Sequence, residues 1–309
     1  MASCSQCPSK DKCPSVGDAS CNGNPPDSRQ SGSSSGSQQS GSRLDAEQSG
    51  KPSLLEPHVL AQVRSVIGIC SGKGGVGKSF VTSLLAINLA RKGLTVGIMD
   101  ADITGPSIPK SFGLRGQISG SADGIFPART HGGIQVVSIN LLLENLEAPV
   151  IWRGPVISGV VRQFWTDVIW DGLDVLLIDM PPGTGDVPLT IFQSVPLDGI
   201  LMVSTPQDLV SLIVRKARNM ALMMEVKILG FIENMSSVKC PDCDHTFSIF
   251  GPGHTGEAAA EMNVPLFDQL SIDPMAAALC DKGELESYTG QDLAGSVDAI
   301  LRLVAAKPS

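Results

Sequence analysis

The sequence predicts an α/β fold of about 250 residues, with a mostly parallel, twisted sheet and helices on both of its faces. Three observations support this prediction. A β-branched apolar run at residues 63–69 leads through a glycine-rich stretch into a helical pattern that begins at Lys78. Further apolar runs alternate with helical patterns. Several of these runs end in acidic or amide side chains, and the carboxyl ends of parallel strands are where such sheets bind ligands.

The glycine-rich stretch has the spacing of a phosphate-binding loop. It consists of Gly72, Lys73, Gly74, Gly75, Val76, Gly77, Lys78 and Ser79. The glycines allow positive φ, so that backbone N–H groups turn inward toward an anion, and the helix that follows adds the positive end of its dipole. We expect Lys78 to reach the β- and γ-phosphates of a nucleotide, and the hydroxyl group of Ser79 to bind Mg²⁺.

Lys73 is an unusual second lysine in this loop. A lysine so early in the loop cannot easily reach the nucleotide of its own chain from the side. It could reach across a dimer interface to the phosphates of a partner's nucleotide, so we predict that it acts in trans and contributes to hydrolysis.

Polar side chains follow three of the expected strands. Asp100 and Asp102 end the run at residues 94–99, and Asp179 ends the run at residues 174–178. We expect Asp102 to orient a water molecule or a Mg²⁺ ligand, and Asp100 and Asp179 to hold Mg²⁺ through water; the alternative for the first two is a turn cap. A backbone N–H of Gly183 can sense the γ-phosphate. Asn234 follows the run at residues 227–232, and its amide can pair with adenine, which favours ATP.

The remaining parts of the chain give weaker predictions. Arg153 meets either a phosphate or a partner, or is a surface residue. The sequence predicts a short hairpin within 124–139, a further strand at 199–204, and helices at 158–170, at 205–224, after Asp273-Pro274 and at 294–306.

Residues 1–57 differ in composition from residues 58–309, so we predict two regions. The first holds Cys4, Cys7, Cys13 and Cys21, followed by a Ser/Gly-rich linker, and has almost no aliphatic residues with which to build a core. Four cysteines in such a segment can bind Zn²⁺ or an iron–sulfur cluster, either of which orders a short peptide. The alternative is a tail with incidental cysteines.

A second cysteine pair, Cys240 and Cys243, is separated by a proline and an aspartate. This spacing can ligate one metal centre but supplies only two of the four ligands that a tetrahedral site needs. His245 is either a third ligand or a solvent-facing residue. Cys70 and Cys280 lie in apolar stretches, so we expect both to be buried in the core.

The net charge of −8 argues against a nucleic-acid-binding surface, which needs clustered Lys and Arg. No apolar run reaches 18 residues, and no secretory or transit signal is found, so we expect a cytoplasmic protein that does not act at a membrane. A chain that uses a nucleoside triphosphate belongs in a reducing compartment, where its eight cysteines are thiols or metal ligands.

Taken in order along residues 55–305, these motifs resemble the Mrp/NUBP family of iron–sulfur cluster assembly ATPases, within the MinD/ParA-like group of P-loop NTPases. The resemblance implies an ATP hydrolase that assembles [4Fe-4S] clusters and transfers them to recipient cytosolic and nuclear apoproteins, as a homodimer or a heterotetramer with a second NUBP-type ATPase. It implies a role for Lys73 between subunits, Asp102 in switch I, Asp179 in the Walker B motif, and a cluster shared between subunits by Cys240 and Cys243.

The cysteine-rich segment resembles the eukaryotic cytosolic branch of this family, whose larger member carries an N-terminal [4Fe-4S] cluster. Cys4, Cys7 and Cys13 match three cysteines of that pattern, and its remaining cysteine would lie upstream of them. Cys21 is therefore the candidate for the fourth ligand.

Three other functions are alternatives. A positioning ATPase of the MinD/ParA type needs a basic surface or a C-terminal amphipathic basic helix, and neither is apparent. An electron-transfer protein similar to the nitrogenase iron protein would share a cluster between subunits, although its ligand cysteines are not paired in this way. A P-loop ATPase could also use Cys240 and Cys243 for structural zinc.

Overall fold

The computed structural model describes residues 54–102, 107–116, 118–142, 154–207, 219, 221–222, 224–240, 242–243, 245–251 and 253–307. Several predictions lie outside these residues: the N-terminal cysteines Cys4, Cys7, Cys13 and Cys21, Arg153, and most of the helix expected at 205–224. The division of the chain at residue 57 stays a prediction.

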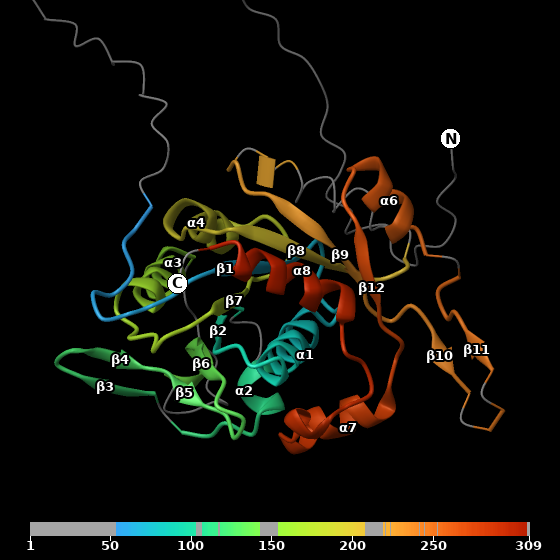
Figure 1. Ribbon diagram of the computed structural model, residues 1–309, viewed down its shortest axis with the longest axis horizontal. Coiled ribbons are helices and arrows are strands. Elements are labelled where there is room, and N and C mark those ends of the chain that lie inside the picture. Colours follow the sequence, from blue (N-terminus) through green and yellow to red (C-terminus); the bar gives the residue numbers. More distant parts are fainter. Residues whose placement is uncertain are drawn as a thin grey trace, which may run out of the picture. The chain divides into compact units, whose positions relative to one another are not determined.

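An eight-stranded sheet forms the centre of the molecule, in the order β12, β9, β8, β1, β7, β2, β6, β5 (Figure 1). All neighbouring strands are parallel except β5 and β6. The α/β fold with a mostly parallel sheet is thus confirmed. The strands are β1 (Val66–Ser71), β2 (Val96–Asp100), β5 (Ala128–Arg129), β6 (Gln135–Ser138), β7 (Val175–Asp179), β8 (Gly199–Ser204), β9 (Ile228–Glu233) and β12 (Leu266–Gln269).

Helices cover both faces of the sheet and create two apolar cores. Successive residues of a strand point to opposite faces; Ile67 and Ile69 of β1 belong to the core with α1 and α8, whereas Val66 and Cys70 belong to the core with α3 and α4. The described helices are α1 (Lys78–Arg91), α2 (Ser107–Ser111), α3 (Gly154–Thr166), α4 (Asp186–Ser194), α6 (Thr255–Glu261), α7 (Pro274–Lys282) and α8 (Ala294–Ala305), with 3₁₀ turns η1 (Ile139–Leu141) and η2 (Leu285–Ser287).

Antiparallel pairs are confined to the periphery. The hairpin expected within 124–139 is confirmed as β5 and β6, and β6 also joins β2 in parallel. Two further two-stranded units were not predicted: β3 (Ser119–Ser121) with β4 (Gly124–Phe126), and β10 (Val238–Lys239) with β11 (Thr246–Phe247). The second of these units carries the cysteine pair near residue 240.

The helix predicted from Lys78 to Arg91 has those bounds, whereas the helix predicted at 158–170 lies four residues earlier, in α3. The reason is a competing backbone pairing. Residues 167–169 leave the helical path because Ile125 donates to the carbonyl of Asp167 and accepts from the N–H of Ile169, at 2.8 and 2.9 Å. None of the described helices is long and apolar enough to cross a membrane.

Candidate functional site

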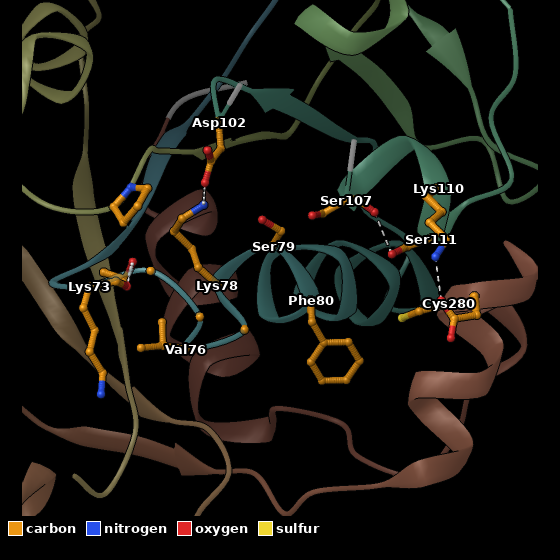
Figure 2. A pocket seen from close by; sticks show the side chains of 16 residues that line it. Lys73, Val76, Lys78, Ser79, Phe80, Asp102, Ser107, Lys110, Ser111 and Cys280 are labelled. Atoms are coloured by element: carbon orange, nitrogen blue, oxygen red, sulfur yellow. Dashed lines mark hydrogen bonds and ion pairs between the residues drawn. The ribbon is translucent and has the colours of Figure 1, made fainter. Parts of the chain in front are cut away.

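A cavity of about 390 Å³ lies over the glycine-rich loop, at the carboxyl end of β1 and the start of α1 (Figure 2). We call it the loop cavity. Its lining includes the loop from Lys73 to Ser79, together with Asp102, Lys110 and Asp281. Strand, loop and helix therefore occupy the positions that the sequence predicts, and Asp102, which follows β2, completes the walls with residues of α2 and α7.

Gly77 has two reasons to be glycine. Its φ is +79°, in the left-handed region, and a Cβ there would lie 2.3 Å from Nδ2 of Asn234. The buried Asn234 amide donates to the carbonyl of Val76 at 3.0 Å and accepts from the N–H of Met235 at 2.9 Å. Asn234 thus stabilises the loop through its hydrogen bond to Val76. Its contact with adenine stays a prediction.

Lys78 is the charged centre of the site. Its Nζ lies 2.9 Å from Oδ1 of Asp179 and 3.3 Å from Oδ2 of Asp102, and its side chain is only 5% exposed. Burial opposes the charge, but the carboxylates of Asp179 and then of Asp102 outweigh burial and raise the pKa of Lys78. Figure 2 shows the Lys78 side chain directed at Asp102. The ammonium group is therefore held where it can meet phosphate.

Asp179 ends β7 next to β1 and is fully buried. One of its oxygens, Oδ2, accepts from the hydroxyl of Ser79 at 2.6 Å; the other accepts from the hydroxyl of Thr82 at 2.8 Å. Carboxylate and hydroxyl oxygens are the ligands that Mg²⁺ prefers, so Ser79 and Asp179 fit a magnesium ion. Sequence reasoning missed Thr82, although its place three residues after Ser79 puts both on one face of α1.

Of the two acids that end β2, only Asp102 lines the loop cavity. Asp100 is buried, accepts from the Ser138 hydroxyl at 2.7 Å and also accepts from the N–H of Asp102 at 3.1 Å. Burial, followed by the charge of Asp179, raises the pKa of Asp100 well above its usual range. Asp100 thus braces the end of β2, and its predicted water-mediated contact with Mg²⁺ stays a prediction.

The two lysines of the loop point in different directions. Figure 2 shows the Lys73 side chain extending away from Lys78 and Asp102, and the Nζ of Lys73 donates to Oε1 of Gln207. Lys78 alone of this pair therefore approaches the acidic residues of its own chain. The action of Lys73 across a dimer stays a prediction.

A second cavity of about 240 Å³ adjoins the loop cavity, and we call it the side cavity. The two share Gly77, Phe80 and Cys280. The remaining lining is mostly apolar and comes from the chain after β9 and from α7: Asn234, Met235, Ser271, Ile272, Asp273, Ala276 and Ala277. Its size and apolar lining suit a flat aromatic ring, next to the loop that is predicted to bind phosphates.

The two cysteines expected in the core differ. Cys70 is buried, its Sγ lies 3.2 Å from Sδ of Met180, and burial raises its pKa to about 12, so this prediction is confirmed. The prediction for Cys280 holds only in part: its side chain packs against the core, but it is partly exposed and lines both cavities. Ala276, one turn earlier on the same face of α7, is buried and also lines the side cavity, so this face of the helix lies between the core and the cavities.

Cys240 and Cys243 lie at the tip of the β10–β11 hairpin, which projects beyond the β12 edge of the sheet (Figure 1). Cys243 is exposed and Cys240 is partly so. Hydrogen bonds from the backbone of Asp242 and then of Cys243 lower the pKa of Cys240, which favours the thiolate that binds metal. His245 is exposed, as its solvent-facing interpretation requires, and stacks on Phe247.

The described part of the chain contains no group of three or more His, Cys, Asp or Glu side chains that could hold a metal ion. The hairpin therefore offers two thiols and no third ligand within the described residues. A four-ligand centre at this place needs ligands from elsewhere.

A glycine-rich loop joins the central parallel strand β1 to a helix. Acidic residues follow the adjoining strand β7 and the strand beyond it, β2. This arrangement defines a P-loop NTPase. The comparisons with known proteins place the chain more narrowly. Residues 62–305 match the ParA family described as NUBPL iron-transfer P-loop NTPase. The chain belongs to this family.

Relatives of known name agree with this assignment. An iron-sulfur cluster carrier protein of Clostridium perfringens is 39% identical over 301 residues, which cover 94% of this chain and 96% of the relative. A protein of the same name from Methanocaldococcus jannaschii is 48% identical, and the match covers 72% of this chain and 78% of that protein. A cytosolic Fe-S cluster assembly factor NUBP2 homolog of Monosiga brevicollis is 38% identical, with 79% and 88% covered.

Solved structures give the same fold. A nucleotide-binding protein of Archaeoglobus fulgidus in complex with ADP is 42% identical, with a TM-score of 0.68 over 75% of this chain and 91% of the other. The septum site-determining protein MinD of Pyrococcus horikoshii is 18% identical, with a TM-score of 0.53 over 78% and 96%. The second likeness shows the MinD-like fold alone.

Proposed function

We propose that this protein binds and hydrolyses ATP with Mg²⁺ and uses it to assemble and carry [4Fe-4S] clusters for recipient apoproteins. One observation carries the proposal: a phosphate-loop site around the buried Lys78 and a cysteine pair with at least one exposed member, Cys240 and Cys243, lie in one chain. Relatives named iron-sulfur cluster carrier protein match over most of their length.

The geometry suggests how a nucleotide is bound. The phosphates lie in the loop cavity against Lys78, and the hydroxyl of Ser79 and the carboxylate of Asp179 hold Mg²⁺, which neutralises phosphate charge. Asp102 lines the same cavity and orients the attacking water. The base enters the side cavity beside Phe80, where an apolar lining accepts a purine ring.

The cluster lies between two chains. A [4Fe-4S] cluster takes four thiolates, and the Cys240–Cys243 pair of two copies supplies four at a two-fold axis. Three large apolar side chains next to the pair, Phe247, Ile249 and Phe250, are between 38% and 52% exposed, and a partner would cover them. The partner is a second copy or a second NUBP-type ATPase, and Lys73 then reaches the partner's nucleotide.

The N-terminal cysteines hold a second cluster in this proposal. Cys4, Cys7, Cys13 and the candidate Cys21 supply its thiolates. Both sets of thiolates suit a carrier that works in the cytosol, where thiols stay reduced.

Anaerobic reconstitution of the full chain tests the proposal. Iron, sulfide and zinc are analysed, and the mass in solution is measured. We expect Cys240→Ala to lose about four irons per dimer, because the shared cluster takes four thiolates. The matched control, Cys280→Ala, keeps them, since Cys280 lies at the cavities and not at the hairpin. Zinc in place of iron, or a monomer that keeps its full iron content, contradicts the proposal.

A further inference from the structure

The chain makes an unusual turn directly after β9. Met235 has a φ of +59°, in the left-handed region, which is strained for a bulky side chain. The residue before it, Asn234, bonds to the phosphate loop at Val76. The residue after it, Ser236, begins the segment that leads into the cysteine hairpin. Met235 therefore lies at the joint between the nucleotide site and the hairpin.

The Met235 side chain belongs to the nucleotide side of this joint. It lines the side cavity, and its Cε is 3.8 Å from the point where a Cβ on Gly77 would lie. A purine ring in the side cavity would thus contact the side chain of Met235. The backbone of the same residue sets the direction of the segment that follows.

Several hydrogen bonds fasten that segment to residues 270–272. The N–H and the hydroxyl of Ser236 both donate to the carbonyl of Leu270 at 2.9 Å. The N–H of Ile272 donates to the carbonyl of Ser237 at 2.8 Å, and the hydroxyls of Ser237 and Ser271 are 3.0 Å apart. A parallel bridge between Val238 and Ile272 continues this attachment into β10.

Part of this attachment also lines the side cavity. Ser271, Ile272 and the next residue, Asp273, line it together with Met235. The base of the hairpin is thus joined to the lining of one cavity at two places, through Met235 along the chain and through hydrogen bonds to residues 270–272. A ring in the cavity would contact the lining at both places, so its binding can change the direction of the hairpin.

We propose that Met235 is a positioning residue through which a purine base in the side cavity sets the position of Cys240 and Cys243. The inference rests on the proposed function, because it takes the base of ADP or ATP as the occupant. It assigns the coupling between nucleotide and cysteines to the base, which does not change during hydrolysis, rather than to the phosphates. Binding and release of nucleotide, more than hydrolysis, then move the hairpin.

The experiment measures the alkylation of each cysteine of the reduced, metal-free full chain by iodoacetamide, with peptide mass spectrometry as the readout. The chain is alone, saturated with ADP, or saturated with pyrophosphate, which fills the phosphate loop and leaves the side cavity empty. We expect ADP to change the alkylation rate of Cys240 and Cys243 by about threefold or more. Pyrophosphate leaves this rate unchanged. Shielding of Cys280, which lines both cavities, reports occupancy in the same samples.

Three variants separate positioning from a merely structural role. Met235→Gly keeps the left-handed backbone and removes the side chain, so ADP still shields Cys280 but no longer changes the rate at the hairpin. Met235→Leu restores an apolar contact and with it the effect. Ser237→Ala, which loses the bond to Ser271, weakens the effect, whereas Ser248→Ala, whose hydroxyl donates only to the carbonyl of Ser236, keeps it.

Two results would overturn this inference alone, and a third would also overturn the proposed function. If pyrophosphate acts on the hairpin as ADP does, or if Met235→Gly keeps the full ADP effect, the signal runs through the phosphate loop and the inference fails alone. If calorimetry detects no ADP binding and ADP does not shield Cys280, both the inference and the proposed function fail.

Discussion

The phosphate site and the cysteine hairpin differ in almost every physical respect. Around Lys78 the charges are buried and each has a partner: Asp179 is fully buried and bonded to three side chains. At the hairpin, Cys243 is exposed, and each of the two strands that flank the turn has only two residues. The first site is held between the ends of β1 and β7 and the start of α1, whereas the hydrogen bonds that join the hairpin to the sheet region lie at its base, at residues 236–238.

The difference teaches which site is complete within one chain. A buried network must satisfy every charge internally, since an unpaired buried charge costs several kcal/mol. Two thiols near the surface have no such constraint, so the other ligands of a metal centre can come from a second chain. The predictions below test this contrast, beginning with the change that should have the largest effect.

Lys78→Ala should abolish nucleotide binding, with a loss in ADP affinity of roughly 100-fold or more, because the phosphates lose their buried cation. Calorimetric titration of ADP measures it. Lys110→Ala is the matched control: Lys110 lines the same cavity, but its ion pair with Asp281 is exposed and worth less than about 1 kcal/mol. Similar losses in both variants would mean that burial does not distinguish the two lysines.

Alkylation of the metal-free protein should separate its thiols by roughly 100-fold in rate at neutral pH, because only the thiolate reacts. Cys240 reacts early, since its pKa is lowered. Cys70 resists, because burial raises its pKa to about 12, and its rate should rise only as the pH approaches that value. Cys280, whose pKa burial also raises, falls between them. Mass spectrometry of the labelled peptides checks this order, and an early reaction at Cys70 would contradict the buried position.

Lys73→Ala should lower kcat for ATP by about tenfold or more and leave ADP affinity nearly unchanged, if Lys73 acts across a dimer as a cation in trans does in related reactions. Its side chain points away from Lys78 within one chain (Figure 2). Hydrolysis assays with calorimetry provide the comparison. An equal loss of affinity in Lys73→Ala and Lys78→Ala would count against action in trans.

Thr82→Val should lower the free energy of unfolding by about 1.5–3 kcal/mol, because the Thr82 hydroxyl donates to the buried carboxylate of Asp179. Thr190→Val is the matched control: its hydroxyl bonds only to the carbonyl of Asp186 in α4, so a loss of about 1 kcal/mol or less is expected. Urea unfolding at neutral pH measures both changes. Equal losses would show that the carboxylate adds nothing.

The sequence was most informative where one local pattern determines the result. The loop from Gly72 to Ser79 and the start of α1 at Lys78 follow from spacing alone, and Asp179 follows from an apolar strand that ends in an acid. Each of these features depends on neighbouring residues in the chain, which is why a single sequence predicts it.

The parts that were missed depend on contacts that are distant in the chain. Thr82 gains its role only because β7 brings Asp179 beside α1, and Asp100 is turned inward by Ser138 of β6. Cys280 looks like a core residue until the cavity beside α7 is known. The hairpin around Cys240 has strands of two residues, too short for a periodic pattern to reveal.

The order of the strands also bears on how the chain acquires its site during synthesis. β7 lies between β1 and β2, so the first two strands of the sheet have no hydrogen bond to each other. The phosphate loop after β1 is thus translated well before Val175–Asp179, the strand that supports it. At about 5–20 residues per second, translating the roughly 100 residues between them takes about 5–20 s. A nascent chain therefore passes through a period in which its loop is present without Asp179, the acid that pairs with Lys78 in the folded site.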